Sequence, residues 1–491
     1  MASAASASSG LALGYTSAAA FQILLSVEWS ALFASFLNIG GLFGSLLSGY
    51  LSSKQGRRWT LCCAYLPGII GWLWLRLSVN SIYEKYSPTV LFMTGRLLTG
   101  ISAGMIIPAS AAFLVEIAPP ELHGLFGTLP QVGIVFGITI AYIFGAFFPW
   151  EHVALINSII LLLLLALSLG LPESPKWLMR SAHDTEAGKP LDSTSSSEAG
   201  SEWRLITYIF PCSAIPQTLK IQLRVAMLLM VLQQFTGINA ILYFAESICM
   251  FGGLSWPSTC AILLGLSQFI FTVVAAFFIN RISRKRMLQW SSLIMCASHL
   301  VHALIILFGK PYSVLTTIGK LSVIVFLFGF SIGWGPLPIL ISMDLFPTAN
   351  RGFAVASAVA VNWIASFVVT STFEPFSLFA GYLFTVRYIP DSISSDSRYY
   401  TFGTPYSVLT IIGKLSVIVF LFGFCIGWGP LPILISMDLF PTANRGFAVA
   451  SAVAVTWIAS FVVVASFEPF SVVAGAGYLF TVRYIPDSIS R

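Results

Sequence analysis

The feature that most constrains the fold is a succession of apolar runs, each about twenty residues long and bounded by charged or turn-forming residues. A run of about this length crosses a bilayer as an α-helix, which satisfies its own backbone hydrogen bonds. Only 9% of the 491 residues are charged, whereas about a quarter are charged in a soluble domain. The short alternating strands typical of a membrane barrel are absent from the sequence. The sequence therefore predicts an all-α polytopic membrane protein.

The apolar runs predict about thirteen spans in all. A weaker run rich in Ala and Ser, Leu11–Leu25, comes first and predicts a shortened first helix. Two runs, Leu415–Leu439 and Phe447–Phe467, come last. The spans between them are Ser30–Leu51, Trp59–Leu77, Val90–Leu114, Leu125–Phe148, Val153–Leu171, Val225–Ile248, Ser258–Ile279, Leu288–Phe308, Leu321–Leu345 and Phe353–Phe373.

The basic residues cluster in three loops, Lys54–Arg58, Lys176–Arg224 and Arg281–Arg286. The positive-inside rule makes these loops and the N-terminus cytoplasmic, and we take the plasma membrane as the default location. Because the net charge of +6 is spread over separate loops, nucleic-acid binding is not predicted. The seven cysteines show no spacing typical of a disulfide framework or a zinc site. No disulfide, metal or cofactor is therefore expected.

Charge motifs recur on both sides of a polar segment that contains "DSTSSSEAGSE". "KQGRR" and "VEIAPPELHG" precede this segment, and "ISRKR" and "SMDLFPTANRG" follow it in the same order. Two parallel six-helix bundles with a ligand site between them explain this pattern. The predicted parts are an N-terminal bundle (residues 1–178), a cytoplasmic linker (179–224), a C-terminal bundle with helices 7–11 (225–405) and a repeated hairpin (406–491).

Several neutral amides lie inside the predicted spans. An amide donates and accepts hydrogen bonds and avoids the cost of an intramembrane charge, so it suits a ligand with many hydroxyl groups. The alternative is that these amides bond only to neighbouring helices. The residues are Gln131, Gln233, Gln234, Asn239, Gln268 and Asn362.

Four further motifs, "GTLPQVGIVFGITIAYIFG", "PESPKWL", "QQFTGINAILYF" and "NW", resemble those of the sugar porters of the major facilitator superfamily. Among these, insect facilitated trehalose and hexose transporters are the most similar. The resemblance implies the major facilitator fold and assigns the six amides and Trp363 to sugar binding. Gln268 stands where the family usually has Asn, and Ile339 replaces the tryptophan usual in the tenth helix. Trp334 lies five residues earlier.

The resemblance also implies a gating network of charges at the cytoplasmic ends of the helices. Glu116 would face Arg57 and Arg58, and Asp344 would face Arg284 and Lys285. His123 and Asn280 stand where the family has an arginine and an acid. Because these replacements remove members of ion pairs, they predict a weaker gating network. The full predicted network is Arg57, Arg58, Glu116, Arg284, Lys285, Asp344 and Arg351.

A long segment occurs twice, because Tyr312–Ala380 and Tyr406–Ala474 align without a gap. The two copies differ at eight positions, including Asn362/Thr456 and Thr370/Val464. Each copy is a helical hairpin, and the family's usual twelfth helix is missing. We expect the first copy to occupy the place of helices 10 and 11, because it keeps Asn362. The glycines and prolines of "GWGPLP" predict a broken tenth helix in each copy.

The predicted function is facilitative (uniport) transport of a sugar such as trehalose or a hexose by alternating access. Uniport is favoured because no Asp or Glu precedes Glu28, whereas proton-driven members of the family carry a carboxylate in the first helix. The alternatives are a non-transporting sugar sensor, a misassembled product of a faulty or alternative gene model, and a carrier of another neutral solute. The sequence shows no catalytic constellation, so no enzymatic activity is predicted.

Overall fold

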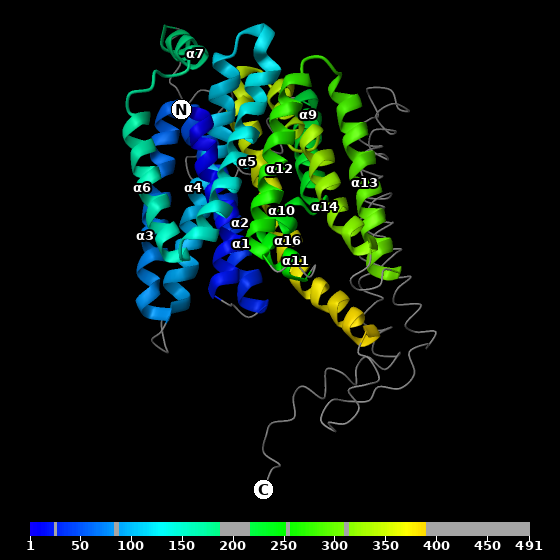
Figure 1. The fold of residues 1–491 in the computed structure, drawn as a ribbon. Helices are drawn as coiled ribbons and strands as arrows, with labels where there is room; N and C mark the ends of the chain where they lie inside the picture. The colour runs from blue at the N-terminus through cyan, green and yellow to red at the C-terminus, as the bar shows by residue number, and fades with distance from the viewer. Residues whose placement is uncertain (24–26, 83–87, 187–216, 252–255, 309–313, 389–491) are drawn as a thin grey trace, which may run out of the picture.

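The computed structural model describes residues 1–23, 27–82, 88–186, 217–251, 256–308 and 314–388. Eight helices in this part of the chain are long and apolar enough to cross a membrane. The predicted all-α polytopic fold is therefore confirmed. The helices stand side by side in two groups, which we call the first and second bundles (Figure 1). The first group contains α1 (Ala2–Ile23), α2 (Val27–Lys54), α3 (Arg57–Ile82), α4 (Pro88–Ile117), α5 (His123–Phe147) and α6 (Trp150–Ser168).

A short amphipathic helix, α7 (Pro175–Glu186), follows the first group and lies at one end of it (Figure 1). We call this the α7 end of the molecule. The single-turn helix η1 (Pro120–Leu122), which precedes α5, lies at the same end. Most of the predicted linker, residues 187–216, lies outside the described residues.

The second group is less regular than the first. It contains α9 (Gln217–Phe235), α10 (Ile238–Tyr243), α11 (Ala245–Phe251), α12 (Pro257–Phe278), α13 (Arg284–Phe308), α14 (Val314–Ile332), α15 (Leu337–Leu345) and α16 (Thr348–Tyr388). We call the end at which α11 lies, opposite α7, the α11 end (Figure 1).

Two expected spans of the second group are interrupted. The run Val225–Ile248 was expected to form one helix, but the structure divides it among α9, α10 and α11. Gly237 lies between α9 and α10 with φ +83°, a left-handed conformation that glycine adopts without a steric penalty. The expected break in the tenth helix is present, because α14 ends at Ile332 and α15 begins at Leu337.

The first copy of the repeated hairpin supplies α14, α15 and α16. The helix α16 packs along α2 and α9, and α14 packs along α13. The second copy, Tyr406–Ala474, lies outside the described residues. Among the described residues, α16 carries Asn362 and Thr370.

The first helix differs from the expected Leu11–Leu25. Because α1 runs from Ala2 to Ile23, its 22 residues span about 33 Å at 1.5 Å per residue. The helix begins earlier than the expected bounds, because the run rich in Ala and Ser before Leu11 is helical too. Small residues let α1 approach α5 closely: a Cβ on Gly10 would collide with the carbonyl oxygen of Ile134.

Glycines also bring α2 and α4 into backbone contact. A Cβ on Gly40 would collide with the carbonyl oxygen of Leu97, and one on Gly104 would collide with that of Gly41. Small residues at such crossings allow close packing of helices in membranes, where no hydrophobic effect drives association. The first bundle is therefore held together backbone to backbone.

A disulfide joins Cys249 at the end of α11 to Cys260 near the start of α12. The spacing of the cysteines did not indicate this pair. The pairing depends on α11 folding back beside α12, which places the two Cα atoms 6.1 Å apart, a separation that a disulfide can span. The bond ties α11 to α12 within the second bundle.

Candidate functional site

A cavity of about 90 Å³ lies between the two bundles. This is several times the roughly 10–15 Å³ that one water molecule needs. Helices α1, α4 and α5 line it from the first bundle, and the broken helices and α12 and α16 line it from the second. All seven residues predicted to bind the ligand line this cavity: Gln131, Gln233, Gln234, Asn239, Gln268, Asn362 and Trp363. Their role in binding stays a prediction.

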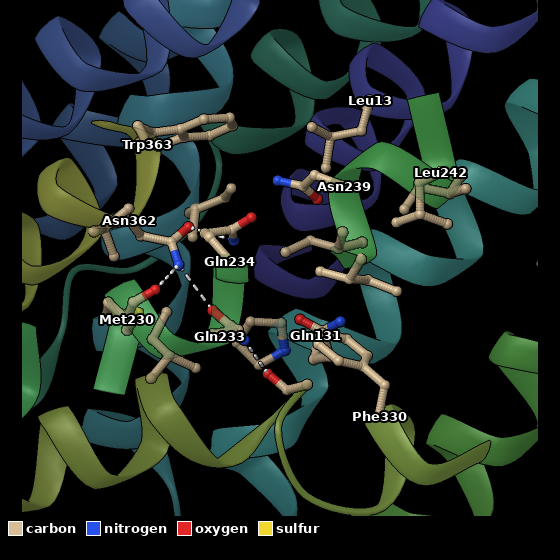
Figure 2. Close-up of a pocket in the computed structure, with 18 of the residues that line it drawn as sticks. Leu13, Gln131, Met230, Gln233, Gln234, Asn239, Leu242, Phe330, Asn362 and Trp363 are labelled. Atoms are coloured by element: carbon tan, nitrogen blue, oxygen red, sulfur yellow. Dashed lines mark hydrogen bonds between the residues drawn. The ribbon is translucent and has the colours of Figure 1, made fainter. Parts of the chain in front are cut away.

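Three of the amides form one hydrogen-bonded chain between α9 and α16 (Figure 2). Gln234 Nε2 donates to Asn362 Oδ1 at 2.9 Å, and Asn362 Nδ2 donates to Gln233 Oε1 at 2.9 Å. Asn362 Nδ2 also donates to the carbonyl oxygen of Met230 at 2.9 Å. These bonds fix which way each amide faces, so the polar wall is preorganised.

Gln233 also connects this chain to the break between α14 and α15. Its Nε2 donates to the carbonyl oxygens of Trp334 and Gly335, at 2.6 Å and 3.0 Å. The break exposes carbonyl groups that no helical N–H satisfies, and Gln233 satisfies two of them. Gln233 therefore contributes to both the cavity wall and the geometry of the broken helix.

The aromatic part of the wall comes from the second bundle. Trp363, Phe330 and Ile339 line the cavity. Trp334 does not, because its indole Nε1 donates to Ser292 Oγ of α13 at 2.8 Å. Ile339 thus lines the cavity where the family usually has a tryptophan, and Trp334 does not take its place.

Some polar atoms of the wall have no hydrogen-bond partner among the described residues. They are the side-chain oxygens of Gln234 and Gln268 and the indole nitrogen of Trp363. Each of these residues is at least nine-tenths buried. An unpaired buried polar atom costs about 1–3 kcal/mol, so a ligand with hydroxyl groups would recover that energy. These two acceptors and one donor belong to residues that line the cavity.

The wall also leads to a second polar cluster, which the sequence analysis did not identify. Asn239 Nδ2 donates to Ser366 Oγ at 2.7 Å, and Ser366 Oγ donates to Asn38 Oδ1 of α2 at 3.1 Å. Tyr243 of α10 donates its hydroxyl to the same Asn38 oxygen at 3.1 Å. Asn38 carries no local sequence signal, because its partners are more than 200 residues away.

A buried arginine in the first bundle was also missed. Arg96 of α4 is fully buried and donates to Thr16 Oγ1 at 2.5 Å and to the carbonyl oxygen of Ala12 at 3.2 Å. Its guanidinium carbon lies 4.4 Å from the ring centroid of Phe33, a cation–π contact. No carboxylate contacts Arg96 among the described residues, so a hydroxyl, carbonyl groups and aromatic rings surround the charge.

The predicted charge network at the α7 end is only partly as expected. Arg57 Nη2 contacts Glu116 Oε1 at 2.6 Å, and both side chains are almost fully buried. Arg58 was expected to face Glu116, but its Nη2 donates to the carbonyl oxygen of Leu169. Glu173, which was not predicted, accepts hydrogen bonds from the backbone N–H groups of Arg57 and Arg58 at 2.8 Å and 3.1 Å. Glu116 and Glu173 thus fix the start of α3 on the first bundle.

The second acidic residue, Asp344 of α15, forms an ion pair with Arg284, as expected. Its other oxygen lies 2.8 Å from His123 Nε2 of α5. Arg351 Nε donates to the carbonyl oxygen of Met343 at 3.0 Å, and Lys285 follows Arg284 in α13. His123 was expected to weaken the gating network, yet it provides a direct contact between the two bundles.

The two bundles contact each other on both sides of the cavity. At the α7 end, Asn280 Nδ2 donates to the carbonyl oxygen of Glu121 at 3.2 Å, beside the His123–Asp344 contact. Toward the α11 end, the backbone N–H of Glu246 donates to Ser17 Oγ at 3.0 Å. The cavity thus lies between two sets of contacts that hold the bundles together.

Comparisons with known proteins agree with this geometry. A family model described as "Sugar (and other) transporter" matches residues 3–388 and 397–485, so the match includes most of the repeated hairpin. The facilitated trehalose transporter Tret1 of Apis mellifera ligustica is 29% identical over an alignment of 381 residues that covers 74% of this chain and 74% of the relative. The facilitated glucose transporter member 8 of solute carrier family 2 from Mus musculus is 28% identical over 405 residues, covering 74% of this chain and 82% of the relative.

Solved structures share the fold. The crystal structure of a D-xylose–proton symporter superposes with a TM-score of 0.58 at 23% identity and covers 76% of this chain and 88% of the symporter. The inward-open xylose transporter XylE from E. coli gives a TM-score of 0.58 at 22% identity, with 80% and 96% of the two chains covered. Both superpositions show that this chain shares the fold of these structures.

Proposed function

The chain belongs to the Sugar (and other) transporter family, and from that premise we propose that it is a facilitative uniporter of a sugar such as trehalose or a hexose. The observation that carries the proposal is the cavity between the bundles, with its oriented amides. A sugar presents hydroxyl groups that replace water as partners and an apolar ring face that suits Trp363 and Phe330. The names of the relatives, a trehalose transporter and a glucose transporter, support this substrate class.

Alternating access follows from the contacts on the two sides of the cavity. Separation of His123 from Asp344 would open the α7 end, and separation of α10 and α11 from α1 and α2 would open the α11 end. The four residues between α14 and α15 and the turn at Gly237 provide points at which the second bundle can bend. The charges at the α7 end, including Arg57 and Glu116, act as the gating network in this proposal.

The surroundings of Arg96 support uniport rather than proton coupling. A proton-coupled carrier needs a group that gains and loses a proton during the cycle. Thr16, the side chain that contacts Arg96 from α1, has no such proton to exchange. Sugar flux through this protein should therefore follow the sugar gradient alone.

Two observations support an orientation with the α7 end in the cytoplasm. The clustered arginines at the starts of α3 and α13 lie at this end, as the positive-inside rule requires. The Cys249–Cys260 disulfide lies at the α11 end, and disulfides persist in oxidising compartments. We place this multi-pass protein in the plasma membrane with the α11 end outside.

The test is uptake of labelled trehalose and labelled glucose into liposomes that contain the full chain. Saturable uptake that is unchanged when an ionophore collapses the pH gradient supports uniport. A chain that ends before Tyr406 serves as the comparison for the repeated hairpin. Sugar binding without flux would contradict transport and indicate a sensor, and a flux that needs the pH gradient would contradict uniport.

A further inference from the structure

Asn38 of α2 is a fully buried amide that the first bundle inserts among residues of the second. Its Nδ2 donates to Thr370 Oγ1 of α16 at 2.9 Å. Its Oδ1 accepts hydrogen bonds from the hydroxyl groups of Tyr243 and Ser366, each at 3.1 Å. These three contacts exist only while the two bundles touch on this side of the cavity.

The same cluster reaches the cavity through Ser366. Asn239 lines the cavity and donates its Nδ2 to Ser366 Oγ at 2.7 Å. A serine hydroxyl has a single proton. While Ser366 accepts from Asn239, it donates that proton to Asn38. The direction of the Ser366–Asn38 hydrogen bond therefore depends on the direction of the Asn239–Ser366 hydrogen bond.

We propose that Asn38 is a positioning residue that couples occupation of the cavity to closure of the α11 end. This inference rests on the proposed role of the cavity as a sugar site. A sugar hydroxyl that donates to Asn239 Oδ1 holds the amide with Nδ2 toward Ser366. Ser366 then donates to Asn38 Oδ1, and the Asn38 amide faces Thr370 with its nitrogen and Tyr243 with its oxygen. Because Tyr243 lies in α10, this arrangement holds α10 against α2.

Opening of the α11 end would break all three bonds of Asn38. Without a sugar hydroxyl on its Oδ1, the Asn239 amide is held toward Ser366 by its Nδ2 bond, and rotation of the amide would remove the fixed bond directions of the cluster. In the loaded protein the directions are fixed and closure is favoured, because the bonds strengthen one another in a buried chain. The sugar thus promotes the contacts that enclose it.

The repeated hairpin provides a natural comparison for this cluster. The second copy keeps a serine at the position of Ser366, which is Ser460, but has Val464 at the position of Thr370. Valine has the shape of threonine without the hydroxyl, so it cannot accept the Asn38 hydrogen bond. Thr370→Val is therefore a substitution that the chain itself carries in its other copy.

The test measures how often the α11 end opens, with Ser17→Cys as the reporter. Ser17 is buried between α1 and α11 and lies outside the Asn38 cluster. A membrane-impermeant maleimide reacts with this cysteine only after opening, and mass spectrometry of the peptide gives the rate. Without sugar, we expect Asn38→Ala to raise the labelling rate about tenfold, because several buried hydrogen bonds are lost. Thr370→Val should raise it about threefold, and Thr370→Ser should leave it within about twofold.

A second arm adds glucose or trehalose at saturating concentration. A sugar that the protein transports should slow labelling when Asn38 is intact. In Asn38→Ala the same sugar should slow labelling much less. The proposal is overturned if the labelling rates of Asn38→Ala and Thr370→Val equal the rate with Asn38 and Thr370 intact. It is also overturned if Thr370→Ser raises the labelling rate as much as Thr370→Val does. If Asn38→Ala does not reach the membrane, the Thr370 pair decides alone. If neither sugar slows labelling even with Asn38 intact, the proposed function fails, while the sugar-free rates still decide the closing role of Asn38.

Discussion

The substitution Asn362→Thr gives a sharp test of the cavity, because the second copy of the hairpin has Thr456 at this position. Asn362 takes part in three hydrogen bonds of 2.9 Å, with Gln234, Gln233 and the carbonyl oxygen of Met230. A threonine hydroxyl can keep one of them. Two lost bonds of about 1 kcal/mol each leave the Gln233 and Gln234 amides free to rotate, so ordering them when sugar binds costs about 2 kcal/mol, which is about thirtyfold in a binding constant.

The assay compares sugar affinity with uptake in liposomes for the original chain and for Asn362→Thr. We expect the apparent KM to rise about thirtyfold while the amount of protein in the membrane stays the same. Ser331→Cys is the matched control, since it is another difference between the two copies and Ser331 lies outside the cavity wall. This control should change KM less than twofold. An unchanged KM in Asn362→Thr would refute the reasoning that the amide chain orients the groups that bind sugar.

Three further predictions concern other parts of the molecule. Gln233→Ala should abolish saturable uptake without loss of protein from the membrane, because it removes both a wall amide and the bonds to the α14–α15 break; retained uptake would exclude Gln233 from the site. Thr16→Asp should make uptake depend on pH, since it places a titratable carboxylate beside Arg96, and a flat pH profile of the variant would count against the uniport argument. Reduction of the Cys249–Cys260 disulfide from the α11 side, with the double Cys→Ser variant as control, should alter maximal uptake more than KM, because the bond ties α11 to α12 outside the cavity.

The sequence predicts the cavity well because its chemistry is local. Each amide of the wall is a polar residue inside an otherwise apolar run, and short motifs such as "QQFTGINAILYF" carry several of them together. The break between α14 and α15 is predictable for the same reason, since Gly333, Gly335 and Pro336 each disfavour a continuous helix. These features need no knowledge of distant contacts.

The missed features depend on contacts between distant segments. Asn38 is the single amide side chain of α2 and Arg96 is the single basic residue of α4, and only the packed bundles show what surrounds them. The Cys249–Cys260 pair forms because α11 folds back beside α12. His123 illustrates the same limit. A histidine in place of an arginine predicts a lost ion pair, but in the structure His123 lies 2.8 Å from Asp344.

The glycine contacts in the first bundle have a consequence for how the protein moves. Helices that touch through their backbones at Gly40 and Gly104 cannot slide without steric overlap, so α2 and α4 must turn together as one block. The interrupted helices of the other half have no such constraint at Gly237. Spin-label distances between α2 and α4 should stay constant through the cycle, and distances from α10 or α15 to α13 should change. The molecule would then be mechanically asymmetric, with a stiff half against which a jointed half bends.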